Sequence, residues 1–254
     1  MPEERLPGGF VNETVLLDGT VRRRPTARSP YLRELLHLFQ KHHWPGAPRH
    51  LGSDEQGRDV LQYVPGHVPW AGGDPAVHEE RSLRELCVLV RQAHDLTQGH
   101  PLAEGGEVVC HNDLSPRNTV YRREGARLHP IALIDWDLAG PGLRIHDVAH
   151  LCWQFLGLGP GTDAAWAAER LRLVADAYGL PDADRARLVP AIIWWQERTR
   201  SGIEAGARDG DPALRELARA GVPARIRAAR EWVTAQRQTL EAPPANFPPR
   251  LDET

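Results

Sequence analysis

Two segments of the chain place acidic and amide side chains directly at the ends of apolar runs. In residues 108–121, two apolar stretches flank a polar loop at residues 111–118, and in residues 131–137 a hydrophobic run ends in Asp135 and Asp137. A bare buried carboxylate is very costly, so an aspartate at the end of a buried strand needs a compensating partner. The two segments therefore predict three short strands arranged around a polar site.

The oxygen-bearing side chains of this site suit a divalent cation. Asp113 and Asn118 lie five residues apart on the loop, and Asp135 follows Asp113 by 22 residues. Mg²⁺ prefers carboxylate, water and phosphate oxygens. A further acid, Asp147, follows twelve residues after Asp135 near the start of a predicted helix, where its simplest interpretation is a helix N-cap.

The pattern His111-x-Asp113-x-x-x-x-Asn118, followed by Ile134-Asp135-x-Asp137, resembles the catalytic motifs of the kinase-like small-molecule phosphotransferases, typified by aminoglycoside phosphotransferases and choline kinases. The resemblance is strong over residues 105–150 and weak elsewhere. It implies an α+β, bilobal protein-kinase-like fold. It also implies transfer of the γ-phosphoryl group of Mg-ATP or Mg-GTP to a hydroxyl of a small molecule: an aminoglycoside or other antibiotic, an amino alcohol, or a sugar-like metabolite. A role in antibiotic resistance would rest on the family alone.

Carried over residue by residue, the resemblance implies distinct roles for the motif residues. Asp113 would be the catalytic residue that orients an acceptor hydroxyl or takes its proton. Asn118 and Asp135 would be the Mg²⁺ ligands. Structural support would come from the remaining motif residues and the later acid: His111, Asp137 and Asp147.

The nucleotide-binding residues implied by the resemblance lie near the start of the chain. Gly8 and Gly9 would form a short phosphate-covering loop, and Gln62-Tyr63-Val64 would be the hinge whose backbone contacts adenine. The family's strand lysine is missing, since Lys41 is the only lysine and lies in a predicted helix. The same count excludes a Walker A loop.

Arg23 is the best substitute for that lysine. It lies two residues from Val21 and so on the same strand face, whereas Arg22 and Arg24 are expected to face away. The helix acid that should pair with such a cation is doubtful, because Glu34 lies opposite the apolar stripe of its helix.

The coarse layout is a small β-rich front and a larger helical back. A nucleotide-binding lobe is expected over residues 1–66, and a helical catalytic and acceptor-binding lobe over 67–254, of which 241–254 is expected to be a loose tail. Asp18-Gly19 predicts a two-residue hairpin, Ser29-Pro30 and Asp74-Pro75 predict helix starts, and a last helix is expected over 223–240.

Composition excludes several classes of protein. The 254 residues carry a formal net charge of −3, which implies no strong attraction to nucleic acid or to anionic membranes. The first residues lack the pattern of a signal peptide, and no stretch is apolar enough to span a bilayer. Three scattered cysteines fit a reducing compartment, so a cytoplasmic protein is expected.

Two other functions remain open. The first is a non-catalytic kinase-like module that binds nucleotide or serves an immunity or regulatory role, which the missing lysine favours. The second is a His/Asp metallohydrolase, because His146 and His150 stand four residues apart on a predicted helix. Trp194, Trp195 and Glu197 could line an acceptor pocket, although core packing is the simpler interpretation of the tryptophans.

Overall fold

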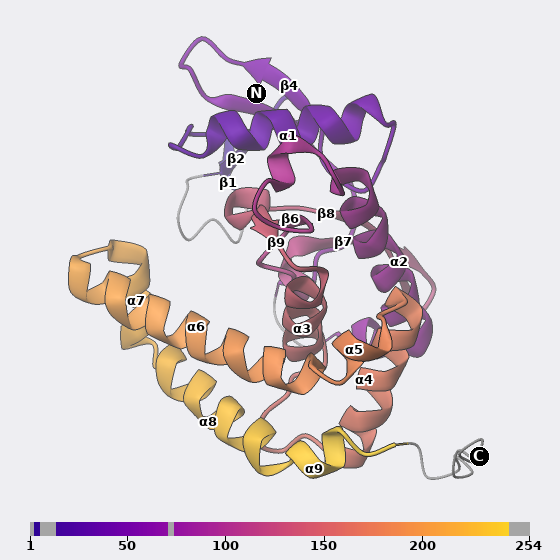
Figure 1. Ribbon diagram of the computed structural model, residues 1–254. Helices are drawn as coiled ribbons and strands as arrows, with labels where there is room; N and C mark the ends of the chain where they lie inside the picture. Colours follow the sequence, from indigo (N-terminus) through magenta and orange to yellow (C-terminus); the bar gives the residue numbers. More distant parts are fainter. Residues whose placement is uncertain (1–2, 6–13, 71–73, 244–254) are drawn as a thin grey trace.

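The computed structural model describes residues 3–5, 14–70 and 74–243. The predicted phosphate loop at Gly8 and Gly9 and most of the predicted tail lie outside these residues. The N-terminal part is an antiparallel sheet in the order β1-β2-β3-β5-β4 with one helix, α1, beside it (Figure 1). Its elements are β1 (Glu4–Arg5), β2 (Thr14–Leu17), β3 (Thr20–Arg23), α1 (Ser29–Lys41), β4 (His50–Ser53) and β5 (Asp59–Gln62).

The β2–β3 hairpin is confirmed. Asp18 and Gly19 connect the strands with φ angles of 50° and 70°, the left-handed conformations that a type I′ turn requires. The register pairs Leu17 with Thr20 and, at the other end, Thr14 with Arg23. Because β3 also pairs with β5, Arg23 stands on an inner strand of the sheet.

The predicted helix start at Ser29-Pro30 is confirmed, and the start at Asp74-Pro75 is displaced. α1 begins at Ser29, but Arg28 and not Ser29 occupies the cap position, and the Ser29 hydroxyl accepts a hydrogen bond from the Thr26 N–H at 2.9 Å. Asp74 caps a short 3-10 helix, Pro75–His78, and the long helix begins only at Glu80. The local capping chemistry is therefore present, but in each case it stabilises the turn that precedes the main helix.

The C-terminal part is mainly helical, with α3 at its centre and α6 and α8 forming an extended arm (Figure 1). Two small antiparallel pairs, β6–β9 and β7–β8, carry the segments singled out in the sequence. The predicted last helix is two helices with a break at Gln236. The elements are α2 (Glu80–Thr97), β6 (Val108–Cys110), β7 (Thr119–Glu124), β8 (Arg127–Leu133), β9 (Gly140–Gly142), α3 (Arg144–Phe155), α4 (Ala164–Tyr178), α5 (Asp182–Arg185), α6 (Leu188–Asp209), α7 (Pro212–Arg219), α8 (Val222–Ala235) and α9 (Arg237–Leu240).

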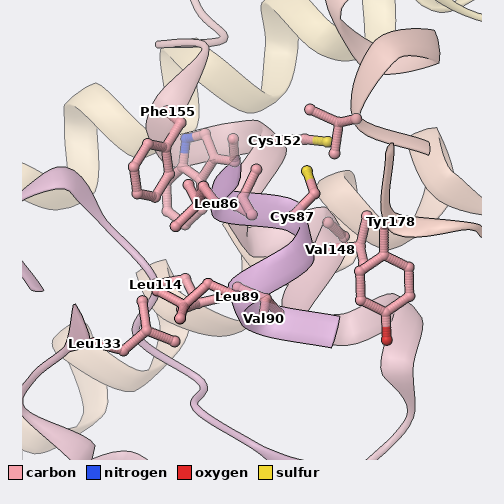
Figure 2. Packing of buried hydrophobic residues seen from close by; sticks show 14 of the residues in the cluster. Leu86, Cys87, Leu89, Val90, Leu114, Leu133, Val148, Cys152, Phe155 and Tyr178 are labelled. Carbon is pink, nitrogen blue, oxygen red and sulfur yellow. The ribbon is translucent and has the colours of Figure 1, made fainter. Parts of the chain in front are cut away.

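The core of the C-terminal part lies between α2, α3, α4 and the β7–β8 pair. Figure 2 shows the α2 side chains beside apolar groups from the polar loop, from β8 and from α3. All three cysteines are buried and free, and burial raises the pKa of the Cys87 thiol to about 12. This packed core includes Leu114 of the loop between β6 and β7 and so fixes the position of that loop.

An aromatic cluster joins α1 to the strand ends below it. Phe39 of α1 lies against Trp44, with ring centroids 4.8 Å apart, and against Trp136, at 5.1 Å. Trp136 in turn contacts His111, at 4.5 Å. The N-terminal helix is therefore packed on Trp136, which follows β8 and in turn contacts His111 of the polar loop.

The two parts are also joined through the backbone after β5. His67 and Tyr121 exchange two backbone hydrogen bonds, each of 2.8 Å. Gly66 lies so close that an added Cβ would fall 2.4 Å from a methyl carbon of Val120. The predicted lobe boundary at residue 66 thus precedes a segment held on β7, and the lobe limits themselves stay a prediction.

Among the described residues, no helix is long and apolar enough to cross a membrane.

Candidate active site

The polar loop between β6 and β7 brings Asp113 and Asn118 together. The Asn118 side-chain amide donates to the Asp113 carbonyl oxygen at 2.9 Å and to its carboxylate Oδ2 at 2.8 Å. The backbone carbonyl of Asn118 accepts a hydrogen bond from the N–H of Ile134 at 2.9 Å, which ties the loop to the end of β8. Because the amide nitrogen is engaged, the side-chain oxygen of Asn118 is the atom left to face a cation.

The carboxyls of Asp113 and Asp135 resist ionisation. Burial, followed by the negative charge of Asp135, raises the pKa of Asp113 to about 7, while the Asn118 hydrogen bond opposes the shift. Surrounding protein and the charge of Asp137 raise the pKa of Asp135 to about 6, with Arg23 opposing. The Asp135 side chain nevertheless stays open to solvent. Crowded carboxylates that a cation can reach form a site that favours cation binding.

The backbone at Asp135 is left-handed, with φ 62° and ψ 59°. Asn112 in the loop also has a positive φ, of 62°. Asp and Asn tolerate this region better than other residues with a Cβ, at a cost of about 1–3 kcal/mol each. The turn at Asp135 ends the strand abruptly and leaves its carboxyl at the edge, beside the loop.

Asp147 is the anchor of the loop. Its carboxylate accepts the backbone N–H of His111 at 2.6 Å and that of Asn112 at 2.9 Å, and it lies 3.0 Å from His94 Nε2. Burial opposes its ionisation, but the His94 hydrogen bond and nearby positive charge hold the pKa of Asp147 below its ordinary value. The predicted N-cap role is wrong, because Asp147 lies one turn inside α3 and caps the loop instead.

His94 and Tyr178 complete this buried network. His94 Nδ1 lies 2.6 Å from the Tyr178 hydroxyl, and both side chains are buried. Their role was missed in the sequence. The available signal was a histidine on the apolar face of α2, four residues after Val90, where an uncompensated imidazole would be costly.

His111 supports the loop from inside. Its Nε2 lies 3.0 Å from the Ile134 carbonyl, and its Nδ1 accepts the Asp113 N–H at 3.3 Å. Burial lowers the pKa of His111, so the ring is neutral, with Nε2 as the donor and Nδ1 as the acceptor. The neutral ring thus fixes the backbone on both sides of the candidate metal site.

Arg23 reaches this site from the N-terminal sheet. Its guanidinium pairs with the carboxylate of Asp137, and its side chain is 11% exposed. Arg22 instead contacts Asp54, at 3.7 Å, and Arg24 is exposed. Arg23 therefore brings positive charge next to Asp135, and its counter-ion is Asp137. Glu34, the helix acid considered as a partner, is exposed on α1.

The predicted hinge lies at the end of β5. The Gln62 N–H donates to the Arg49 carbonyl at 2.8 Å, and its side-chain oxygen accepts from the Arg49 side chain at 3.1 Å. Tyr63 and Val64 follow the last paired residue of the sheet. Because the Gln62 N–H is already used, an adenine contact from this segment would fall to Tyr63 and Val64.

The two histidines of the hydrolase hypothesis have other roles. His146 stacks on Trp194, and His150 Nδ1 lies 3.0 Å from the Leu114 carbonyl. Within the described part of the chain, the one cluster of three or more His, Cys, Asp or Glu side chains close enough to share a metal ion is His94, Cys110 and Asp147. These three side chains are already engaged in hydrogen bonds, so the structure gives the hydrolase reading no support.

Glu197 is neutralised by its neighbours. It contacts Arg200 at 2.5 Å and Arg230 at 2.9 Å, and the Arg200 hydrogen bond lowers the pKa of Glu197 to about 2. Trp195 is buried, and its indole N–H donates to the His146 carbonyl at 2.6 Å. Trp194 differs, because its side chain is 43% exposed.

Comparisons with solved structures report the same fold. A choline/ethanolamine kinase family protein from Mesorhizobium loti has a TM-score of 0.60 at 17% identity, over 95% of this chain and 93% of that chain. The GDP and kanamycin complex of APH(2″)-IIIa has a TM-score of 0.58 at 14% identity, over 93% of each chain. An aminoglycoside phosphotransferase from Streptomyces rimosus, in complex with ADP and streptomycin, has a TM-score of 0.57 at 16% identity, over 75% of this chain and 92% of that one.

Sequence comparisons name the family. A trifolitoxin immunity protein of Rhizobium leguminosarum bv. trifolii is 27% identical over 274 residues, which cover 93% of this chain and 97% of that protein. The family model described as phosphotransferase enzyme family matches residues 17–189, which is more than half of the chain. The match includes the polar loop, Asp135, Asp137 and Asp147. The chain therefore belongs to the phosphotransferase enzyme family.

Proposed function

We propose that the protein transfers the γ-phosphoryl group of Mg-ATP or Mg-GTP to a hydroxyl of a small molecule. The observation that carries the proposal is the grouping of Asp113, Asn118 and Asp135: Asn118 hydrogen-bonds to Asp113 at 2.8 Å, and Asp135 is near enough for its charge to raise the pKa of Asp113. Related structures hold GDP with kanamycin and ADP with streptomycin. The family and these neighbours support a nucleotide donor and a hydroxylated acceptor.

The residues at this site fit Mg²⁺. Asn118 would offer its side-chain oxygen and Asp135 its open carboxylate, which are the hard oxygen ligands that this ion prefers. When bound, Mg²⁺ would neutralise part of the negative charge of the phosphates. The proximity of Asp113 and Asp135 fits such an ion, because the charge of Asp135 raises the cost of ionising Asp113 and a cation would offset it.

Asp113 would orient the acceptor hydroxyl and take its proton. As the acceptor oxygen bonds to the γ-phosphorus, the bond from that phosphorus to the bridging oxygen of the nucleotide breaks and the nucleoside diphosphate leaves. The acceptor proton passes to the Asp113 carboxylate, whose pKa of about 7 matches a group that exchanges protons near neutrality. Positioning and charge neutralisation supply most of the catalysis in this type of reaction.

Arg23 would hold phosphate oxygens in place of the missing lysine. Its guanidinium is planar and can grip two oxygens at once, and it stays charged throughout the working pH range. The Asp137 pair already holds the Arg23 side chain beside Asp135. A phosphate group next to the metal site would therefore meet a cation whose position is set in advance.

The test is nucleoside diphosphate release from ATP and GTP across a panel of hydroxylated acceptors, including kanamycin, streptomycin, choline and ethanolamine. Asp113→Ala is expected to lower turnover on a confirmed acceptor by ~10²–10⁴-fold, with Mg-nucleotide binding retained. Asp182→Ala, at a carboxyl that is 94% exposed on α5, is the matched control. A wild-type rate for Asp113→Ala would refute the assigned role.

A second function has a specific observation in its favour. The similarity to a trifolitoxin immunity protein covers almost the whole of both chains. An immunity module that does not catalyse transfer would bind nucleotide, release no diphosphate across the panel, and protect cells challenged with trifolitoxin even as the Asp113→Ala variant. Protection that disappears with Asp113→Ala would instead join immunity to phosphoryl transfer.

A further inference from the structure

A pocket of about 280 Å³ opens between the start of α3 and the first two turns of α6. Its walls are apolar and aromatic, and a cation stands among them: Ile145, His146, Arg187, Pro190, Ala191 and Trp194. Ligand pockets usually span ~300–1,000 Å³. This one lies just below that range, so it suits a single ring system rather than a whole oligosaccharide.

The aromatic wall of the pocket is preorganised. His146 stacks on Trp194 with ring centroids 4.9 Å apart and an interplanar angle of 19°. Trp195 packs edge-on against Trp194 at 5.1 Å and is itself fixed by the hydrogen bond to the His146 carbonyl. An exposed tryptophan held in this way offers a rigid surface, so a bound ring costs little ordering of the protein.

The charged side chain that lines the pocket is an arginine. Arg187 lines it with a side chain that is 65% exposed, and its contact with Asp184 is long, at 3.8 Å. Arg198 lies over the Trp194 ring, 5.3 Å from the centroid. Burial lowers the pKa of His146, which makes it a neutral ring at pH 7. Among the described residues that line the pocket, none is acidic.

The aromatic surface is therefore unsuited to an ammonium ligand. Arg187 lines the pocket and Arg198 lies over the neighbouring Trp194 ring, so both guanidinium groups would repel a cationic ligand. Glu197 of α6 is held by Arg200 of the same helix and by Arg230 of α8. A carboxylate on the ligand would instead find the Arg187 guanidinium within reach of a ring seated in the pocket.

We propose that the α3–α6 pocket binds an aromatic or heteroaromatic group that carries a carboxylate, with the ring among the apolar walls beside Trp194 and the acid at Arg187. This site goes beyond the proposed phosphoryl transfer, because binding there requires neither nucleotide nor metal. The pocket nevertheless adjoins the polar loop through α3. Asp147 and His150, which follow His146 on α3, hold that loop.

The test uses three ligands with one ring system and different charges: indole-3-acetate, tryptamine and 3-methylindole. Isothermal titration calorimetry on the full chain, without nucleotide, is expected to show indole-3-acetate binding about tenfold more tightly than tryptamine, with 3-methylindole between them. Arg187→Gln should remove the preference for the acid and leave the affinity for 3-methylindole unchanged. Arg208→Gln, at an exposed arginine of the same helix, is the matched control and should change nothing.

A second variant tests the location. Ala191→Phe places a ring inside the pocket and should abolish binding of all three ligands, with the melting temperature reporting that the protein is folded. Persistent binding to Ala191→Phe would place the ligand elsewhere and overturn the proposal. Equal affinities for indole-3-acetate and tryptamine, or no binding by any ligand up to its solubility limit, would overturn it as well.

Discussion

The polar loop and the N-terminal sheet are connected to the candidate metal site by different kinds of contact. The loop is held from beneath by the fully buried carboxylate of Asp147, which accepts two backbone N–H groups and meets His94. The sheet reaches the site through a side-chain ion pair, Arg23 with Asp137, whose carboxylate side is 26% exposed. Under the proposed function, the chemistry would fall to the loop and the nucleotide contact to the sheet.

This difference shows where the chain tolerates departures from its family. The acids and the asparagine of the polar loop share several hydrogen bonds with buried partners, so a change there would leave buried polar atoms unsatisfied. The strand cation, Arg23, is held by a side-chain ion pair with Asp137. We therefore expect the missing lysine to affect nucleotide affinity more than the fold.

The largest expected effect is at the anchor. Asp147→Ala should lower the free energy of unfolding by about 3–5 kcal/mol, because it strands the His111 and Asn112 N–H groups and leaves His94 without its carboxylate. Chemical denaturation measures the change. The control Asp209→Ala removes an exposed acid and should have little effect. An unchanged midpoint for Asp147→Ala would show that the loop is not held in this way.

The next effect concerns the metal ligands. Asp135→Asn should raise the Mg²⁺ concentration needed for half-maximal activity by on the order of tenfold, and by more than Asn118→Ala does, because it removes a formal charge from the ligand set. A Mg²⁺ titration of turnover on a confirmed acceptor checks the order. A crystal structure with nucleotide and Mg²⁺ in which neither side chain lies within roughly 2.0–2.5 Å of the ion would contradict the assignment.

The pH dependence of stability tests the crowded carboxyls. The pKa of Asp113 is raised in the folded state, so between about pH 4 and 7 the folded chain binds more protons than the unfolded chain. Its contribution to stability is therefore lost as the pH rises through this window, by at most roughly 1.4 kcal/mol per pH unit. Thermal unfolding at several pH values should show a flatter profile for Asp113→Asn. A wild-type slope in that variant would assign the effect to other groups.

The smallest effect separates three neighbouring arginines. Arg23→Ala should weaken Mg-nucleotide binding by roughly tenfold, as loss of a charge-assisted contact does, while Arg22→Ala and Arg24→Ala should leave it nearly unchanged. Asp137→Ala tests whether the counter-ion positions Arg23. In the double variant, a loss smaller than the sum of the two single losses would show the coupling. Equal losses for all three arginines would indicate general electrostatics rather than a clamp.

Much of the fold could be predicted because its signals are local. Asp18-Gly19 marked a hairpin through the backbone conformation it permits, and the apolar runs before Asp113 and Asp135 marked the strands that carry the site. The long helix predicted from Asp74 was misplaced because Asp74 caps a short 3-10 helix that precedes α2. Sequence spacing does not reveal which of two adjacent turns a polar side chain will stabilise.

The remaining parts of the site depend on contacts between distant residues. His94 is 53 residues from Asp147, and Arg23 is 114 residues from Asp137. The strand face of Arg23 followed from alternation, but its counter-ion did not, because Asp137 lies far from Arg23 in the sequence. The helix acid Glu34 is exposed on α1, and the carboxylate that pairs with Arg23 is that of Asp137, two residues after Asp135.

The aromatic cluster of Phe39, Trp44 and Trp136 has a consequence for how such a protein can be controlled. In protein kinases, repositioning of an N-terminal helix governs activity. In this protein Phe39 of α1 packs against Trp136, which also packs against His111. Backbone amides of α1 should therefore exchange with deuterium as slowly as those beside the loop, as one cooperative unit. A helix bound in this way cannot swing as a switch, so activity would respond to the supply of nucleotide and acceptor.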